Sequence, residues 1–168
     1  KTLRKIGSYL QGHPDMKNIP GVDMTTGSLG QGLSVANGMA LSSKLNHDGF
    51  RVYCLLGDGE IEEGQIWEAA MSAAHYKLNK LIVFVDNNGL QIDGKITEVN
   101  SPTPIRERFA AFGFNAIDID GHDFEEIQNA VKKAKSYLNV SAFSYEGLIE
   151  QLEFEKFSHA DAVYGVDN

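Results

Sequence analysis

The sequence contains a single cysteine, Cys54, and this scarcity excludes an internal disulfide as a source of stability. Cys54 lies inside the apolar run 52–56, where a cysteine is more often a small buried hydrophobe than a nucleophile. A chain without disulfides fits a reducing compartment, and we expect a cytoplasmic protein.

Basic residues and long apolar runs are also lacking. Lys and Arg total 15 against 23 Asp and Glu, and the net charge of −8 argues against a nucleic-acid-binding surface. No apolar stretch has the length of a membrane span, and the polar start around Lys1, Arg4 and Lys5 lacks a signal-peptide core. The chain begins without methionine, so we expect a fragment or a processed product. A phosphorylated ligand would need local donors or a metal to overcome the acidity.

The sequence does contain short β-rich runs that alternate with longer helical stretches. Residues 51–56 and 80–86 are continuous apolar runs, as expected of strands covered on both faces. The intervening stretch 63–78 places five residues on one helical face, namely Ile66, Ala69, Ala70, Ala73 and Ala74. A strand–helix–strand unit implies parallel strands joined by a right-handed crossover. We therefore predict an α/β fold with a doubly wound parallel sheet.

Further elements are predicted on both sides of this unit. Residues 30–45 are typical of a helix, although three glycines in it cost helix stability and indicate close packing. Thr103 is predicted to cap a helix that starts at the following proline, and residues 114–119 alternate as in a half-buried strand. Asp123 and Glu126 form a capping-box start of a last helix. Its apolar stripe comprises Phe124, Ile127, Val131 and Ala134.

The character of the chain changes after about residue 136. We predict an α/β domain over 1–135 and a small helical tail over 136–168, with short helices near 144–153 and 158–166. The tail contains no convincing strand pattern.

The most informative segments lie at the ends of the two predicted strands. Gly57, Asp58 and Gly59 follow the first strand, and Asn87 and Asn88 follow the second. Open α/β sheets bind ligands at the carboxyl edge, so both segments are expected where a ligand binds. A carboxylate and an amide oxygen suit Mg²⁺ or Ca²⁺ better than zinc. The helix after the first strand directs its N-terminal amides toward the same space, which favours a diphosphate.

Each feature also has an ordinary structural explanation. Asp-Gly turns are common in proteins, so Gly57–Gly59 alone is a weak signal. His13 taken alone is more often a surface histidine, and Glu60, Glu62 and Glu63 can be acids that favour a helix N-terminus. The functional interpretation depends on several motifs occurring together.

Together these segments resemble the thiamine diphosphate signature of transketolases and their relatives. The resemblance includes GHPD at 12–15, PGV at 20–22 and TTGSLGQG at 25–32. The stretches GDGEIEEGQIWEAA and DNNGLQIDG are most similar to the amino-terminal subunit of split transketolases. The match covers about residues 1–135, is truncated at both ends, and implies the thiamine diphosphate-binding fold of the PP type.

The resemblance implies ligands for a cation and for the diphosphate of the cofactor. Asp58 and Asn88 would coordinate Mg²⁺, or Ca²⁺, through their side chains, and Leu90 would do so through its backbone oxygen. Gly59, beside Gly57, would donate its amide to the diphosphate.

The resemblance also implies positions at the reacting end. Gly27, Ser28 and Leu29 would border the thiamine rings. His13 would face the hydroxyl and carbonyl end of a sugar phosphate substrate. Glu63 would lie at the subunit interface, near the glutamate that activates the cofactor.

The implied activity is transfer of a two-carbon ketol unit between sugar phosphates, as in the pentose phosphate pathway. In this family the activating glutamate comes from the pyrimidine-binding domain of a neighbouring subunit, and no such domain fits in this chain. We therefore expect that a separate pyrimidine-domain subunit, or else a dimer or larger homo-oligomer, completes the site. The alternatives are a catalytically silent binding or interaction module and another thiamine diphosphate enzyme, such as a deoxyxylulose-phosphate synthase.

The tail has a resemblance of its own. Residues from about 129 to 168 resemble the short helical Ltp-like module of host-cell-surface lipoproteins from Gram-positive bacteria and their phages. The plainer interpretation, which we slightly prefer, is a small amphipathic cap that covers the edge of the sheet.

Overall fold

The structure, a computed structural model, describes residues 2–140 of the chain and the side chains of residues 2–134. The described residues fall into two compact units that divide between Asp118 and Ile119, and all of the predicted site residues belong to the first. The helices predicted at 144–153 and 158–166 lie outside the described residues. The predicted domain boundary after residue 135 stays a prediction.

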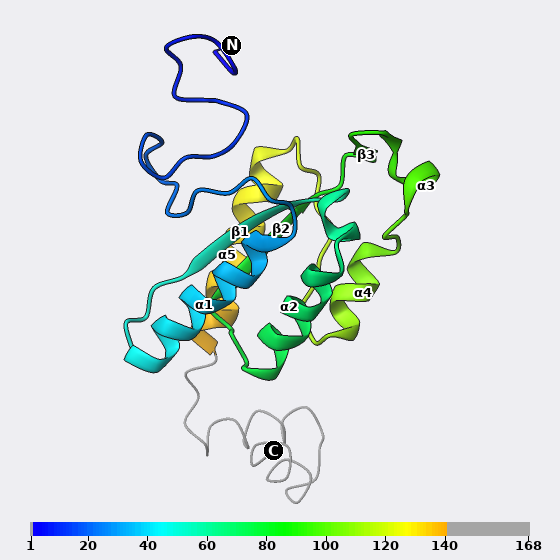
Figure 1. The fold of residues 1–168 in the computed structure, drawn as a ribbon. Coiled ribbons are helices and arrows are strands. Elements are labelled where there is room, and N and C mark those ends of the chain that lie inside the picture. Colours follow the sequence, from blue (N-terminus) through cyan, green and yellow to red (C-terminus); the bar gives the residue numbers. More distant parts are fainter. Residues whose placement is uncertain (1, 141–168) are drawn as a thin grey trace, which may run out of the picture. The chain divides into compact units, whose positions relative to one another are not determined.

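Two parallel strands form the centre of the first unit. β1 (Val52–Gly57) pairs with β2 (Leu81–Asp86) in a register that runs from Val52 opposite Leu81 to Gly57 opposite Asp86. The short 3-10 helix η1 (Glu60–Glu62) and helix α2 (Gly64–His75) connect the two strands (Figure 1). The predicted strand–helix–strand unit and the α/β fold class are confirmed.

Helix α1 (Gln31–Asn46) completes the core of this unit by packing against β1 and α2 (Figure 1). The helix predicted over 30–45 is therefore confirmed. Large side chains from each element meet in one cluster, and the fully buried ones are Leu33, Leu56, Ile61 and Ile66. Removal of this apolar surface from water holds the helices against the strands.

Only one face of β1 is buried, whereas its continuous apolar run predicted burial on both faces. Val52, Cys54 and Leu56 point into the cluster formed with α1 and α2, while Tyr53 and Leu55 are exposed. Both helices contribute to the same cluster, so they cover the same face of the strand. Burial raises the pKa of the Cys54 thiol to about 11, which fits the predicted role as a small hydrophobe.

The rest of the first unit consists of short elements. β3 (Leu90–Gln91) and β4 (Gly94–Lys95) form an antiparallel pair, followed by α3 (Ile96–Val99) and α4 (Ile105–Ala111). The prediction for the start of α4 is wrong. Pro104 is the residue that precedes the helix, and the Thr103 hydroxyl pairs with Ser101 at 2.8 Å.

The strand predicted over 114–119 is absent from the described part of the chain. The inner positions of the alternating pattern are Phe114 and Ala116, which pack against the core cluster. The Phe114 amide donates to the carbonyl of Phe109 at 3.2 Å, and their rings meet edge to face with centroids 5.6 Å apart. The alternation thus reflects packing on α4, without a partner strand to form a ladder.

The second unit contains α5 (Phe124–Val140). The predicted cap is confirmed, because Asp123 Oδ1 accepts the amides of Glu125 at 2.7 Å and Glu126 at 3.2 Å. In a capping box the Glu126 carboxylate would accept the amide of Asp123. It accepts the amide of Asp120 instead, three residues earlier. Between residues 2 and 140, no helix is long and apolar enough to cross a membrane.

The one-sided burial of β1 gives a test with a neighbouring control. Leu56→Ala removes a side chain that is 1% exposed and should lower the free energy of unfolding by about 2–5 kcal/mol. Leu55→Ala, on a residue that is 73% exposed, should change it by less than about 0.5 kcal/mol. Urea denaturation followed by circular dichroism measures both. Equal losses for the two variants would contradict the burial pattern.

Candidate cofactor site

The carboxylate of Asp58 lies between the ends of the two central strands. Asp58 is only 1% exposed, and its amide donates to the carbonyl of Asp86, the last residue of β2, at 3.1 Å. Its Oδ2 accepts the amide of Gly89 at 2.6 Å, and Gly89 directly follows Asn88. The parallel register has therefore brought the GDG turn and the two-asparagine turn together at the carboxyl edge, as predicted.

Asn88 shapes the second of these turns. Its Oδ1 accepts the amide of Leu90 at 2.9 Å, and its Nδ2 donates to Asp86 Oδ2 at 3.1 Å. The side chain is exposed, and its carbonyl oxygen keeps a second lone pair for another contact. Asp58, Asn88 and Leu90, the three predicted metal ligands, thus belong to two turns joined by a direct hydrogen bond.

The chemistry of these groups fits a hard divalent cation. A buried carboxylate needs a compensating charge, and none of the ion pairs among the described side chains involves Asp58. Across residues 2–134, no three His, Cys, Asp or Glu side chains gather at one point. The candidate donors are one carboxylate, one amide and one backbone carbonyl, which suit Mg²⁺ or Ca²⁺ when phosphate oxygens complete the shell.

Gly59 allows the turn after β1 to lie close to β3. A Cβ atom at Gly59 would lie 3.0 Å from Cγ of Gln91 in β3, closer than such contacts normally come. The Gly59 amide donates to Asp58 Oδ1 at 2.9 Å. Donation to a diphosphate oxygen, the role implied by the resemblance, would therefore exchange one anionic acceptor for another.

A residue without a predicted role, Glu60, joins two loops of the site. Its Oε1 accepts the amide of Gly30 at 3.0 Å, and its Oε2 accepts the amide of Gly57 at 3.1 Å. The first bond spans 30 positions of sequence. An acid at the start of a helix already has a local explanation, and no spacing rule points to a partner so far away.

His13 lies against the loop that precedes α1. A Cβ atom at Gly27 would be 3.2 Å from Nδ1 of the His13 ring, so a larger residue there would push against the imidazole. The Thr26 amide donates to the carbonyl of Pro14 at 3.4 Å and holds the two segments together. The structure therefore joins two segments that the sequence predicted to share a site.

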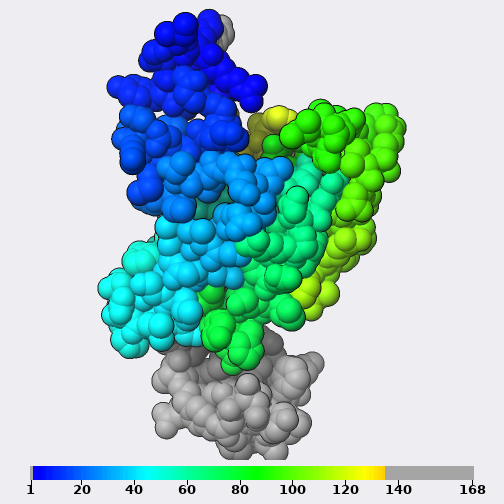
Figure 2. Space-filling view, in the orientation of Figure 1, coloured from blue at the N-terminus to red at the C-terminus, as the bar shows by residue number. Residues whose placement is uncertain are grey.

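The reacting end of the candidate site is open. His13, Ser28 and Glu63 are exposed, and Leu29 is 53% exposed. Glu63 precedes α2 and lies beside Gly30, where a Cβ atom would come within 2.9 Å of the Glu63 Cβ. Figure 2 shows the blue segment that leads into α1 bordering the green segment of η1 and α2. The predicted roles of these residues stay predictions.

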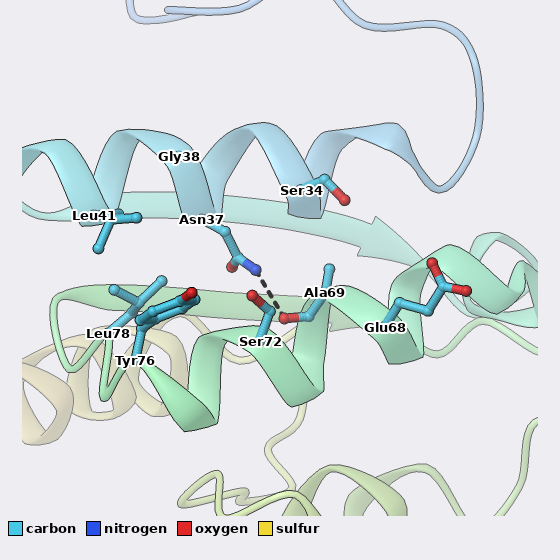
Figure 3. A pocket seen from close by; sticks show the side chains of 9 residues that line it. All are labelled: Ser34, Asn37, Gly38, Leu41, Glu68, Ala69, Ser72, Tyr76 and Leu78. Carbon is cyan, nitrogen blue, oxygen red and sulfur yellow. Dashed lines mark hydrogen bonds between the residues drawn. The ribbon is translucent and has the colours of Figure 1, made fainter.

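A separate hollow of about 360 Å³ lies between α1 and α2 and contains none of the predicted site residues (Figure 3). Within it, the Asn37 Nδ2 donates to the carbonyl of Ala69 at 2.8 Å and ties the two helices together. Its walls are formed by Ser34, Asn37, Gly38, Leu41, Glu68, Ala69, Ser72, Tyr76 and Leu78. The hollow lies along the helix–helix seam, whereas the cofactor residues lie at the strand ends, so we place the site at the strand ends.

Parallel strands with glycine turns and oxygen donors at their carboxyl ends are typical of α/β proteins that bind phosphorylated ligands. Comparison with known proteins makes this specific. The chain belongs to the family described as "Transketolase, thiamine diphosphate binding domain", which matches residues 1–143. A second family, described as "Host cell surface-exposed lipoprotein", matches residues 125–168. Both resemblances noted in the sequence are confirmed.

Relatives include proteins named as transketolase subunits. The chain is 49% identical over 134 residues to the 6-deoxy-6-sulfo-D-fructose transketolase subunit SqwG of Clostridium sp. (strain MSTE9), covering 80% of this chain and 49% of that protein. It is 44% identical over 126 residues to an apulose-4-phosphate transketolase subunit of Phocaeicola vulgatus, covering 75% and 44%. The chain thus spans about half the length of these curated relatives.

Solved transketolases share the fold. The transketolase of Campylobacter jejuni superimposes with a TM-score of 0.69 at 35% identity, covering 80% of this chain and 22% of that one. The transketolase of Leishmania mexicana gives a TM-score of 0.66 at 35% identity with the same coverage.

Gly30, which precedes α1, and Gly38, inside α1, have different surroundings, so replacing each with alanine should change the free energy of unfolding in opposite directions. Gly30 has a φ of 84° and abuts Glu63, so Gly30→Ala should lower the free energy of unfolding by about 1–3 kcal/mol. Gly38, inside α1, has no atom within 4 Å of the methyl group that alanine would add, and Gly38→Ala should raise it by about 1 kcal/mol. Chemical denaturation of both variants measures the difference. A neutral Gly30→Ala would contradict the contact with Glu63.

Proposed function

We propose that this chain binds thiamine diphosphate through a divalent cation and forms the cofactor-binding half of a transketolase. The observation that carries this proposal is the buried Asp58 carboxylate held between two strand ends by the Gly59 and Gly89 amides. Membership of the thiamine diphosphate-binding family supports it independently of the geometry.

The chain's own residues would hold the cofactor at its charged end. Asp58 and Asn88 would coordinate Mg²⁺, or Ca²⁺, with the Leu90 carbonyl, and the cation would neutralise the diphosphate. Gly57 and Gly59 would allow the backbone to approach the phosphates closely. The net charge of −8 makes such a cation important, because it offsets repulsion between the acidic chain and its anionic ligands.

Other residues would position the reacting end. Gly27, Ser28 and Leu29 would border the thiamine rings, and His13 would hydrogen-bond the hydroxyl and carbonyl end of a sugar phosphate. When bound, thiamine diphosphate supplies a carbon nucleophile and an electron sink for cleavage of the ketose carbon–carbon bond. The protein's contribution is to orient donor and acceptor sugars and to exclude water.

A second subunit would complete the catalyst. We infer that a pyrimidine-domain chain, or another copy in a dimer, supplies the glutamate that activates the cofactor, with Glu63 at the contact. Two relatives named as transketolase subunits support a divided enzyme. The reaction would be ketol transfer between sugar phosphates of the pentose phosphate pathway in the cytoplasm.

A catalytically silent binding module is the second candidate. One observation favours it, because a lipoprotein family matches residues 125–168. Cofactor binding without ketol transfer, even after addition of a pyrimidine-domain subunit, would support that candidate. A deoxyxylulose-phosphate synthase fits less well, since the relatives described above are transketolases.

The metal assignment predicts the behaviour of Asp58→Asn, which keeps the size of the side chain. Loss of the anionic ligand should weaken Mg²⁺-dependent binding of thiamine diphosphate by more than about 100-fold, since residues that only support a ligand typically contribute 10–100-fold. Isothermal titration calorimetry with the wild-type chain and the variant, with and without Mg²⁺, measures this loss.

Asp118→Asn is the matched control, because Asp118 is an exposed partner of Arg106 with a 3.3 Å contact. It should bind the cofactor as the wild type does. Equal affinity of Asp58→Asn and wild type, in variants whose circular dichroism shows a folded chain, would falsify the metal assignment.

A further inference from the structure

The two carboxylate oxygens of Glu60 reach two separate loops. Oε1 accepts the Gly30 amide at 3.0 Å, and Oε2 accepts the Gly57 amide at 3.1 Å, with both bonds partly buried. Gly30 directly follows the predicted ring-bordering residues 27–29, and Gly57 directly precedes the predicted metal ligand Asp58. One side chain therefore fixes the spacing between the two ends of the candidate site.

The contact with Gly30 supplies what α1 itself lacks. The residue that precedes α1 is a glycine, which has no side chain for capping, and the first turn of α1 contains no acidic residue. A carboxylate near a helix N-terminus is favourable because the exposed amides carry partial positive charge. Glu60 provides that carboxylate from the start of η1, 30 positions further along the chain.

Other contacts hold the same two segments at close range. The side-chain amides of Gln31 and Gln65 donate to each other at 2.7 and 3.0 Å, and join the first turn of α1 to that of α2. Gly30 also abuts the Cβ of Glu63. These contacts hold the start of α1 close to the start of α2, beside the Glu60–Gly30 hydrogen bond.

We propose that Glu60 is a positioning residue that holds the loop before α1 and the turn after β1 in the arrangement that receives the cofactor. This inference rests on the proposed function, which supplies the ligand, and goes beyond it by giving Glu60 a role in positioning the two loops. A carboxylate suits this role because each of its two oxygens accepts one amide, whereas a glutamine would place its NH₂ donor against one of the two amide donors.

The test is Glu60→Gln, which preserves size and removes one acceptor. In nitrogen-15 NMR spectra of the unliganded chain, at least one of the Gly30 and Gly57 amide protons should shift upfield and exchange faster with water. Calorimetry with thiamine diphosphate and saturating Mg²⁺ should show a dissociation constant raised on the order of tenfold, the loss expected for one charge-assisted hydrogen bond. Both measurements are made well below the unfolding temperature of each variant.

Glu98→Gln is the control, since it makes the same change in a surface ion pair with Lys95. It should leave the glycine signals and the affinity unchanged. Glu60→Asp, whose shorter side chain cannot span both amides, serves if Glu60→Gln does not fold, and should show the same losses. A purely structural role predicts a lower unfolding temperature with wild-type affinity in the folded state, and that result would overturn the proposal.

The two proposals fail in different ways. If the wild-type chain binds no thiamine diphosphate, the proposed function fails, and the contact of Glu60 with both loops is still tested by the NMR signals. If the wild type binds the cofactor and Glu60→Gln binds it within twofold, the positioning role fails and the proposed function stands.

Discussion

The first unit depends on a buried carboxylate that joins the ends of two neighbouring strands. The packing of Leu33, Leu56 and Ile66 would hold α1 and α2 on the sheet in any case, but it does not define the turns beyond the strands. Asp58 does so, because its oxygens accept amides from the turn after β1 and from the turn after β2. A buried carboxylate with amide donors but no basic side chain is costly unless a cation accompanies it. That cost is the physical reason for proposing that a cation binds at this edge.

Glu60 adds a second carboxylate with a different task. Asp58 connects two strand ends that the parallel register already places side by side, whereas Glu60 connects a strand end to the start of α1. The two acids together leave the turn around Gly57–Gly59 with little freedom before any ligand is present. Preorganisation of this kind lowers the entropy lost on binding, which is valuable when the ligand contacts are mostly with backbone groups.

Much of this arrangement was predictable from the sequence, for reasons that differ between elements. The apolar runs fixed β1 and β2, and parallel pairing then required the GDG turn and the two asparagines to meet. The prediction of a strand over 114–119 is wrong, because an alternating pattern shows only which side chains point inward. Phe114 and Ala116 point inward because they pack on the core cluster, without a partner strand. Glu60 was missed because its local position explains an acid there, and its distant partner Gly30 offers only a backbone amide, which leaves no trace in side-chain identity.

The candidate site divides into a closed half at the strand ends and an open half around His13. At the strand ends, Asp58 and its amide partners are supplied within one compact unit. At the reacting end, His13 and Ser28 are exposed and Leu29 is half exposed. Carbon–carbon bond cleavage needs a site from which water is excluded, because electrostatic stabilisation is strong only there. Under the proposed function, the closed half would hold the diphosphate, whereas the open half would require a further surface that excludes water from the reaction.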